Sequence, residues 1–175
     1  HVDPLASDRV TLPAGEAVNL QIEPEAAMIA DVAYDADGRV RSLTPLYLGA
    51  FNDCSIRREG AVKISHKKNW GPASKGLAAR LFAVDSLDVP GPTEHLRLAS
   101  FLRRDGETHD YGIDSPVREY SYYGTRLIDW IIDRLREQRD SPDTPIENVG
   151  EYLTACGHPS RVVIGLGATR YTELG

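Results

Sequence analysis

Three carboxylates set within apolar sequence have the types and spacing to do chemistry. Glu23 and Glu25 flank Pro24, and Asp53 follows in a polar run further along the chain. Apolar residues stand on both sides of each acid, which favours entry of the acids into the interior. An unpaired ionised carboxylate is strongly disfavoured there, and pairing or metal coordination is the usual remedy. The sequence therefore predicts a site for a divalent cation.

Residues 18–34 are predicted to form the strand that positions the first two acids. Residues i and i+2 of a strand face the same side, so Glu23 and Glu25 would project together. Pro24 cannot donate to a ladder, which indicates an edge, a bulge or a strand end. Solvated glutamates on an exposed edge are the alternative interpretation of this pattern.

Cations follow the third acid. Arg57 comes shortly after Asp53, a basic stretch covers residues 63–68, and Lys75 lies between two small residues. Three oxygen ligands suit Mg²⁺, Mn²⁺ or Ca²⁺ rather than zinc, and the sequence has no Cys/His cluster for a softer metal. Cations beside this site would suit a small anionic substrate, although a solvated loop is the alternative for the basic stretch.

Taken in order, these segments resemble the fumarylacetoacetate hydrolase-like superfamily. The resemblance covers nearly the whole chain. Residues 52–58 and 64–71 look like an uncharacterised bacterial branch of that superfamily. The segments that carry the resemblance are Glu23-Pro24-Glu25, Asn52-Asp53 with Arg57, Trp70 before Lys75-Gly76, and residues 161–169.

The resemblance implies a fold, a cofactor and a set of site residues. The implied fold is α+β and strand-rich, a mixed β-roll or sandwich of the fumarylacetoacetate hydrolase C-terminal type with flanking helices. The implied cofactor is Mg²⁺, or Mn²⁺ or Ca²⁺ in its place. The implied residues are the metal ligands Glu23, Glu25 and Asp53, the substrate-holding Arg57 and Lys75, and the pocket-closing Gly167 and Thr169.

One part of the superfamily pattern is missing. The superfamily carries a His/Glu pair well upstream of the first two acids, where it manages a proton, but His1 has no such partner here. We therefore expect residues 1–175 to be a single domain that lacks upstream and downstream segments of a longer protein. His66 is the only histidine close in sequence to the acids and is a candidate replacement base, with a surface imidazole as the alternative.

Three functional hypotheses follow. The first is a metal-dependent hydrolase or lyase that acts on a small 2-oxo acid or 1,3-dicarbonyl compound through a metal-stabilised enolate, by C–C bond hydrolysis or decarboxylation. The second is a non-catalytic domain that binds a metal and a carboxylate ligand. The third is an interaction domain in which the acids pair with Arg57 and Lys75. Hydratase and isomerase activities stay open too, since one metal enolate serves them all.

Composition limits the number of domains, the partners and the cellular compartment that the sequence allows. A hydrophobic content of 41% over 175 residues is enough for one substantial core rather than two. A net charge of -6 argues against nucleic acid as the main partner. No apolar run is long enough to span a membrane. The two cysteines form no metal-like spacing, so a reducing cytoplasm is the default. A homodimer is possible, because superfamily members are often dimers.

Turn signals divide the chain into short elements. Residues 35–38 and 105–106 predict hairpin turns. The clearest helix is predicted to begin with Ser115 as N-cap and Pro116 at the first position, and it carries an apolar stripe over residues 123–135. Trp130 lies off the centre of that stripe, which indicates a flanking contact.

The C-terminal part predicts a helix and a strand beside the pocket. A linker over residues 140–145 precedes a short helix over 146–155 that Gly157 ends. A buried strand over 162–164 then leads into a glycine pair, which permits close approach of the backbone to a ligand, with a plain turn as the alternative. The tyrosines at positions 120, 122 and 123 are interpreted as packing residues.

Overall fold

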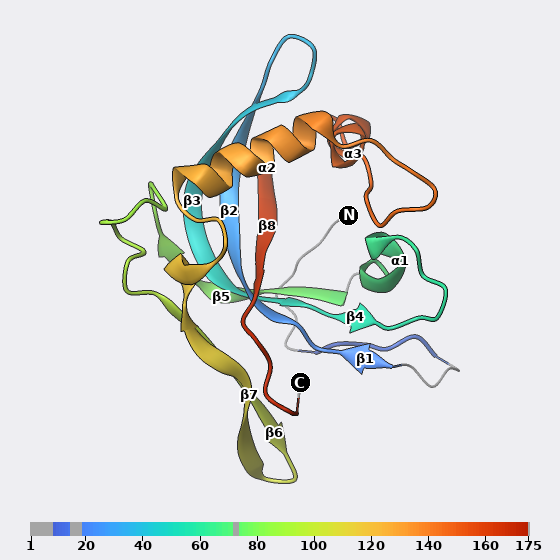
Figure 1. Ribbon diagram of the computed structural model, residues 1–175, viewed down its shortest axis with the longest axis vertical. Coiled ribbons are helices and arrows are strands. Elements are labelled where there is room, and N and C mark those ends of the chain that lie inside the picture. The colour runs from blue at the N-terminus through green and yellow to red at the C-terminus, as the bar shows by residue number, and fades with distance from the viewer. Residues whose placement is uncertain (1–8, 15–18, 72–73, 175) are drawn as a thin grey trace.

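The computed structural model describes residues 9–14, 19–71 and 74–174. It is α+β and strand-rich, as the sequence predicts (Figure 1). In chain order the elements are β1 (Leu20–Gln21), β2 (Pro24–Tyr34), β3 (Val40–Asp53), β4 (Ser55–Ile56), α1 (Ile64–Lys68), β5 (Lys75–Ala83), β6 (Arg97–Arg104), β7 (Glu107–Pro116), a 3-10 helix (Val117–Glu119), α2 (Thr125–Glu137), α3 (Val149–Ala155) and β8 (Arg161–Ala168).

A four-stranded antiparallel sheet in the order β5-β3-β2-β8 forms the centre of the fold. The predicted turn over residues 35–38 joins β2 to β3, and Gly38 adopts a left-handed φ of 76° there. The Asp35 carboxylate accepts the backbone N–H groups of Asp37 and Arg39, which stabilises the turn. From this turn β3 runs without interruption to Asp53, so the hairpin itself delivers the third acid to the site.

The predicted strand over residues 18–34 is interrupted at Ile22 and Glu23, and its first residue, Val18, lies outside the described residues. β1 ends at Gln21 and β2 begins at Pro24, so Glu23 stands in the connection while Glu25 belongs to β2. The break fits Pro24, which has no N–H to donate. β1 continues as a separate small ladder with β4.

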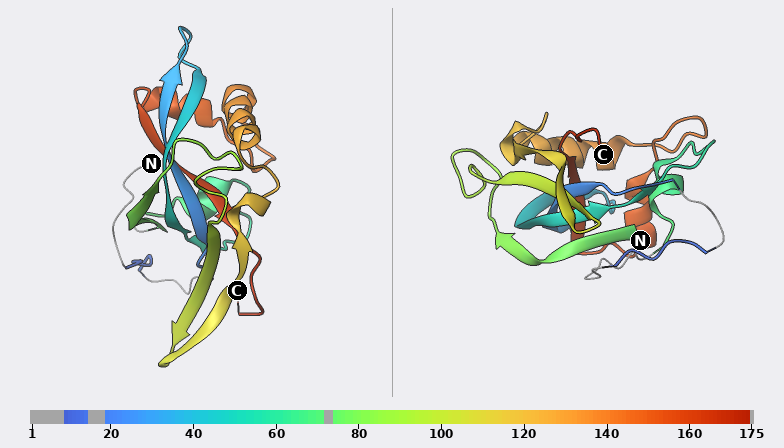
Figure 2. Two further views of the ribbon diagram at one scale, coloured as in Figure 1. Left: turned by 90° about the vertical axis from the view of Figure 1, so that its left-hand side faces the viewer. Right: turned by 90° about the horizontal axis from the view of Figure 1, so that it is seen from below.

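Helix α2 covers one face of the sheet, as the side view shows (Figure 2). Its predicted apolar stripe is confirmed, because Leu127 and Ile131 are buried against core residues that include Met28 and Val32. Complete burial of such a side chain stabilises the fold by ~1.5–3 kcal/mol. The predicted contact of Trp130 is a stacked pair with Tyr122, with ring centroids 5.4 Å apart.

The start of this helix was predicted wrongly. Ser115 and Pro116 form the end of β7, where Pro116 pairs with Arg97, and α2 begins only at Thr125. Strand pairing therefore overrides the local capping signal. The cap comes from a distant segment instead, because the Asp88 carboxylate accepts the Thr125 N–H at 2.7 Å.

The short C-terminal helix is confirmed as α3, although it begins at Val149 behind an Asn148 cap rather than at residue 146. Gly157 follows it with a φ of 76°, as its predicted role requires. The predicted buried strand over residues 162–164 is present in β8, but only Val162 and Ile164 pack against the core, and neither is fully buried. β8 lies at the end of the sheet order, so alternate side chains face outward and Val163 is 38% exposed.

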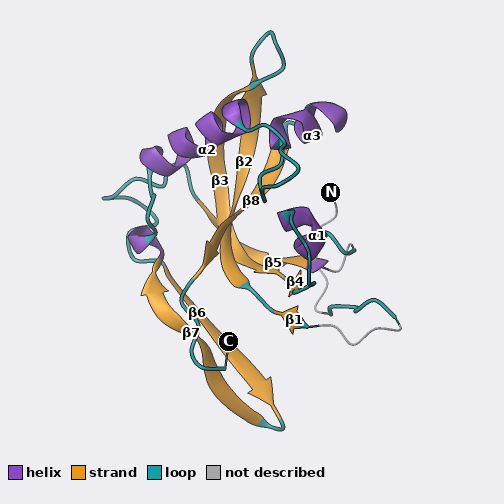
Figure 3. Ribbon diagram, turned by 45° about the vertical axis from the view of Figure 1, so that its right-hand side comes forward, coloured by secondary structure: helices purple, strands orange, loops and turns teal. Residues whose placement is uncertain are grey.

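Strands β6 and β7 form an arm that extends away from the helices (Figure 3). The predicted turn at Asp105-Gly106 joins them, with both residues in the left-handed region. Within the described ranges, no helix is long and apolar enough to cross a membrane.

Candidate metal centre

The three acids of the predicted metal site come together where β2 begins and β3 ends. Glu25 pairs with Phe51 across the ladder, and the Asp53 N–H donates to the Glu23 carbonyl at 3.0 Å. One carboxylate oxygen from each of Glu23, Glu25 and Asp53 lies within 4.8 Å of the others. Glu25 is 8% exposed, and the side chains of Glu23 and Asp53 are each 14% exposed. The expectation that these acids face one another in the interior is therefore met.

Two lysines neutralise part of this charge. The Lys68 ammonium donates to Glu23 Oε2 at 2.9 Å and to Asp53 Oδ2, so it bridges two of the three acids. Lys75 donates to Asp53 Oδ1 and to the Lys68 carbonyl. Both lysines are mostly buried, with exposed side-chain fractions of 21% and 24%. Burial alone would lower the pKa of Lys68, but its hydrogen bonds to Asp53 and Glu23 raise it overall.

Arg57 lies at the outer side of the cluster. Its guanidinium donates to Gln21 and to Glu23 Oε1, and 43% of its side chain is exposed. Glu23 Oε1 also accepts the Ser55 hydroxyl at 2.5 Å. Arg57 thus combines a structural contact inside the cluster with access to solvent.

Glu25 carries the least compensated charge of the three acids. Burial and, after it, the charge of Asp53 raise the pKa of its carboxyl from 4.5 to about 7, while Lys68 acts in the opposite sense. Near neutral pH the Glu25 carboxyl of the ion-free protein is therefore protonated in about half of the molecules, and a cation bound to it would displace that proton.

The late glycines touch this same carboxylate. A Cβ added at Gly165 would lie 2.6 Å from Glu25 Oε2, so only glycine leaves room for the acid. The Gly167 N–H donates to Glu25 and lowers its pKa slightly against the larger effect of burial. The glycine pair therefore leaves room for the Glu25 carboxylate and hydrogen-bonds to it.

Tyrosines border the cluster. The Tyr120 hydroxyl donates to the Gly167 carbonyl at 2.7 Å, and burial together with the charge of Glu25 raises its pKa to about 12. The rings of Tyr111 and Tyr171 are in contact at a tilt of 57° with their centroids 5.4 Å apart, and burial raises the pKa of both hydroxyls. Tyr120, which was predicted to be a packing residue, therefore also lies beside the acids.

Two predicted site residues make no hydrogen bond or ion pair with the acids among the described residues, although Thr169 directly follows Ala168, the ladder partner of Glu25. His66 lies on α1 with an exposed side chain, and among the described residues no contact joins it to the carboxylates. Thr169 follows β8, and its hydroxyl lies 2.8 Å from the point where a Cβ on Gly112 would sit. The basic stretch is not the solvated loop of the alternative interpretation, because its residues 64–68 form α1.

Sequence reasoning did not assign Lys68, Ser55 or Gly165 to the site. Lys68 had a weak signal, since it belongs to the basic stretch, but a helix of five residues gives no periodicity that would show which side chain points inward. Ser55 contacts Glu23, and Gly165 lies against Glu25. Both contacts join segments far apart in the sequence, so no local pattern predicts them.

A family model described as a family of unknown function (DUF5718) matches residues 1–175. The chain belongs to this family. No curated protein and no solved structure matches it. The function of this DUF5718 member is therefore argued from its own site.

The donor set of this DUF5718 member suits a hard divalent cation. The three candidate ligands are all carboxylates, the donors that Mg²⁺, Mn²⁺ and Ca²⁺ prefer. The raised pKa of Glu25 comes first from burial and then from the charge of Asp53, and Lys68 offsets it only in part. A cation that used the inner oxygens of Glu23 and Asp53 would have to compete with the Lys68 ammonium.

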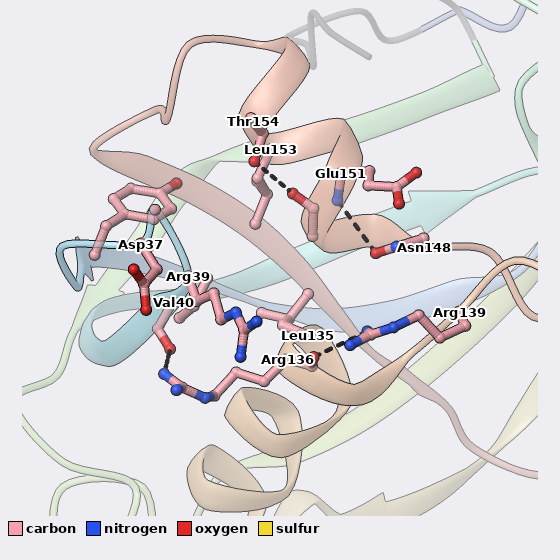
Figure 4. Close-up of a pocket in the computed structure, with 13 residues that line it drawn as sticks. Asp37, Arg39, Val40, Leu135, Arg136, Arg139, Asn148, Glu151, Leu153 and Thr154 are labelled. Carbon is pink, nitrogen blue, oxygen red and sulfur yellow. Dashed lines mark hydrogen bonds between the residues drawn. The ribbon is translucent and has the colours of Figure 1, made fainter.

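Two hollows occur in the described part of the fold, one that reaches the cluster and one at the opposite end of the β2–β3 hairpin. An apolar cavity of ≈ 680 Å³ follows β8 and includes Phe51, Lys75 and Gly165 in its lining. A polar hollow of ≈ 300 Å³ lies at the end of the β2–β3 hairpin, and Arg136 and Arg139 are among its lining residues (Figure 4). Several hydrogen bonds already engage these arginines, so the polar hollow is best explained as the joint between α2 and the hairpin.

Proposed function

We propose that this protein is a divalent-cation-dependent enzyme that acts on a small 2-oxo acid or 1,3-dicarbonyl compound, by C–C bond hydrolysis or decarboxylation through a metal-stabilised enolate. The observation that carries the proposal is the convergence of Glu23, Glu25 and Asp53 within 4.8 Å in a largely buried site, with Lys68 and Lys75 against them. Such a site combines hard oxygen donors for a metal with cations for an anionic substrate.

The three acids would hold Mg²⁺, which when bound supplies a Lewis acid that polarises a substrate oxygen. Lys75 would neutralise an anionic oxygen of the substrate. Arg57, with its exposed planar guanidinium, would orient a carboxylate by a pair of parallel hydrogen bonds. Gly165 and Gly167 would keep the Glu25 carboxylate in position.

Two of these residues, His66 and Glu25, are candidates for the group that transfers a proton. His66 would have to act from the surface of α1, where its imidazole is exposed. The Glu25 carboxyl, with a pKa of about 7, can exchange a proton near neutral pH in the metal-free protein, and a cation bound to it would displace that proton.

The fold is proposed to be the mixed β-roll of the fumarylacetoacetate hydrolase C-terminal type. Two features support this: the acids stand at adjoining strand ends of an antiparallel hairpin, and the late glycine strand β8 lies beside Glu25. A solved structure of the protein that lacked closure of the strands into a roll would contradict it.

The proposal is tested by calorimetric titration with Mg²⁺ and Mn²⁺. We expect one binding site that Asp53→Asn weakens at least tenfold, because the substitution removes a charged ligand. Asp31→Asn is the matched control, since Asp31 is a half-exposed acid paired with Arg161 at the far end of β2. Cleavage of oxaloacetate or an acylpyruvate should also require the metal. Equal Mg²⁺ affinity in the wild type and both variants would reject the metal site.

A second candidate is supported by the charge count of the cluster. Three acids face three cations, Lys68, Lys75 and Arg57, so the ionised cluster is neutral without a metal. In a non-catalytic binding or interaction domain these residues would act as an ion-pair network. This candidate predicts no metal dependence in the titration above.

A further inference from the structure

The apolar cavity beside β8 has the size and lining of a ligand site. Its volume of ≈ 680 Å³ falls within the ~300–1,000 Å³ of typical small-molecule pockets. Aliphatic side chains from the sheet, α2 and α3 dominate its wall. They include Val32, Leu43, Ile131, Leu153, Val162 and Ile164.

One end of this cavity meets the carboxylate cluster. Phe51, Lys75 and Gly165 line the cavity, while Lys75 also binds Asp53 and Gly165 lies directly beneath the Glu25 carboxylate. The cavity and the cluster therefore share a boundary made of residues that belong to both.

The other end is formed by α3. Val149 and Tyr152 of this helix line the cavity, and they remain 37% and 49% exposed. Cys156, directly after the helix, completes this end. Apolar side chains on α3 thus border an open space, which an apolar chain would fill with favourable burial.

We propose that this cavity binds the apolar chain of the substrate, whose anionic head lies at Lys75 and the carboxylate cluster. The substrate class is then a 2-oxo acid or 1,3-dicarbonyl compound that carries a linear alkyl or acyl chain, rather than a compact dicarboxylate. The assignment of the head group rests on the proposed function, whereas the assignment of the chain rests on the cavity. Arg161 also lines the cavity, but its guanidinium is already paired with Asp31 at 2.8 Å. A second charged group on the ligand would therefore lose its hydration mainly against aliphatic side chains, so a dicarboxylate is disfavoured.

The first test is a binding series in the presence of Mg²⁺, from pyruvate through 2-oxohexanoate to 2-oxooctanoate. Each added methylene that enters the cavity should tighten Kd about fourfold, which corresponds to ~0.8 kcal/mol. Equal affinity of pyruvate and 2-oxooctanoate would overturn the assignment of the cavity.

The second test uses Cys156 as a local reporter, because it is exposed while Cys54, the other cysteine, is fully buried. 2-Oxooctanoate should slow the reaction of Cys156 with a thiol reagent at least tenfold, and pyruvate at equal occupancy should not. Alkylation of Cys156 with a bulky maleimide should in turn remove the advantage of long chains and leave pyruvate binding intact.

These readouts separate the two levels of the proposal. If no 2-oxo acid binds with Mg²⁺ but octanoate protects Cys156, the proposed function fails and the chain site stands. If Mg²⁺-dependent pyruvate binding is found and no long-chain acid protects Cys156, the chain site is wrong and the proposed function stands.

Discussion

Replacement of Glu25 by glutamine should make the metal-free protein more stable at alkaline pH. The folded state raises the pKa of this carboxyl from 4.5 to about 7, mainly by burial. Below pH 4.5 the carboxyl is protonated in both folded and unfolded states, and it costs nothing. As the pH rises from 4.5 through 7 the unfolded state is the one that ionises freely, so wild-type stability falls until the folded carboxyl ionises as well. Glutamine never ionises and avoids this loss.

The size of the effect follows from the two pKa values. Each pH unit of difference corresponds to ~1.36 kcal/mol, and the whole interval from 4.5 to about 7 gives roughly 3 kcal/mol, most of it lost between pH 5 and pH 8. For a chain of this size ~1 kcal/mol moves Tm by ~2–4 °C, so the relative shift is about 5–10 °C. Urea unfolding of wild type and Glu25→Gln at pH 5 and pH 8, both with EDTA, measures it.

The experiment compares two proteins at two pH values. The contributions of all titrating groups that both proteins share cancel in the difference between their free energies of unfolding. The free energy of unfolding of Glu25→Gln minus that of the wild type should be more positive at pH 8 than at pH 5 by about 2–3 kcal/mol. Saturating Mg²⁺ should reduce this gap at pH 8 by stabilising the wild type, since it binds the ionised carboxylate. The same difference at both pH values would refute the burial of an uncompensated charge at Glu25.

Three further variants test the cluster. Lys68→Met should tighten Mg²⁺ binding at least tenfold in a calorimetric titration, because the ammonium bridges two of the proposed ligands; weaker binding would mean that Lys68 supports the site instead. Arg57→Lys should weaken oxalate binding roughly three- to tenfold at unchanged Mg²⁺ affinity, since it keeps the charge and loses the planar pair of donors; an unchanged oxalate Kd counts against the role of Arg57. Gly165→Ala should weaken Mg²⁺ binding severalfold, because its Cβ would displace the Glu25 carboxylate, while Val163→Ala on the same strand should not; equal effects of both would remove the glycine from the site.

Local patterns predicted the parts of the site that local chemistry controls. The i, i+2 spacing around Pro24 and its apolar flanks predicted that Glu23 and Glu25 would face inward together. The turn chemistry of residues 35–38 predicted the hairpin. The hairpin register then brings Asp53 to them, because a long β3 leaves the turn and ends beside the start of β2.

Local sequence patterns did not predict the features that depend on residues far away in the sequence. The Asp88 carboxylate caps α2 from another part of the chain, so the local signal at Ser115 and Pro116 misled. Lys68 reaches the acids from a helix too short to show a periodic face. The exposure of alternate residues in β8 follows from its place at the end of the sheet, which sequence hydrophobicity does not reveal.

The charge balance of the cluster links its metal and its substrate. With all groups ionised, the three acids offset Lys68, Lys75 and Arg57, so a divalent cation alone leaves an excess of two positive charges in a partly buried site. A dianionic ligand, such as oxalate or the enolate of a 2-oxo acid, restores neutrality. Metal and anion should therefore bind with positive coupling, and by linkage each should raise the affinity of the other by the same factor. A purely structural ion-pair network has no reason to show that reciprocity, which makes the coupling a sharper criterion of function than metal binding by itself.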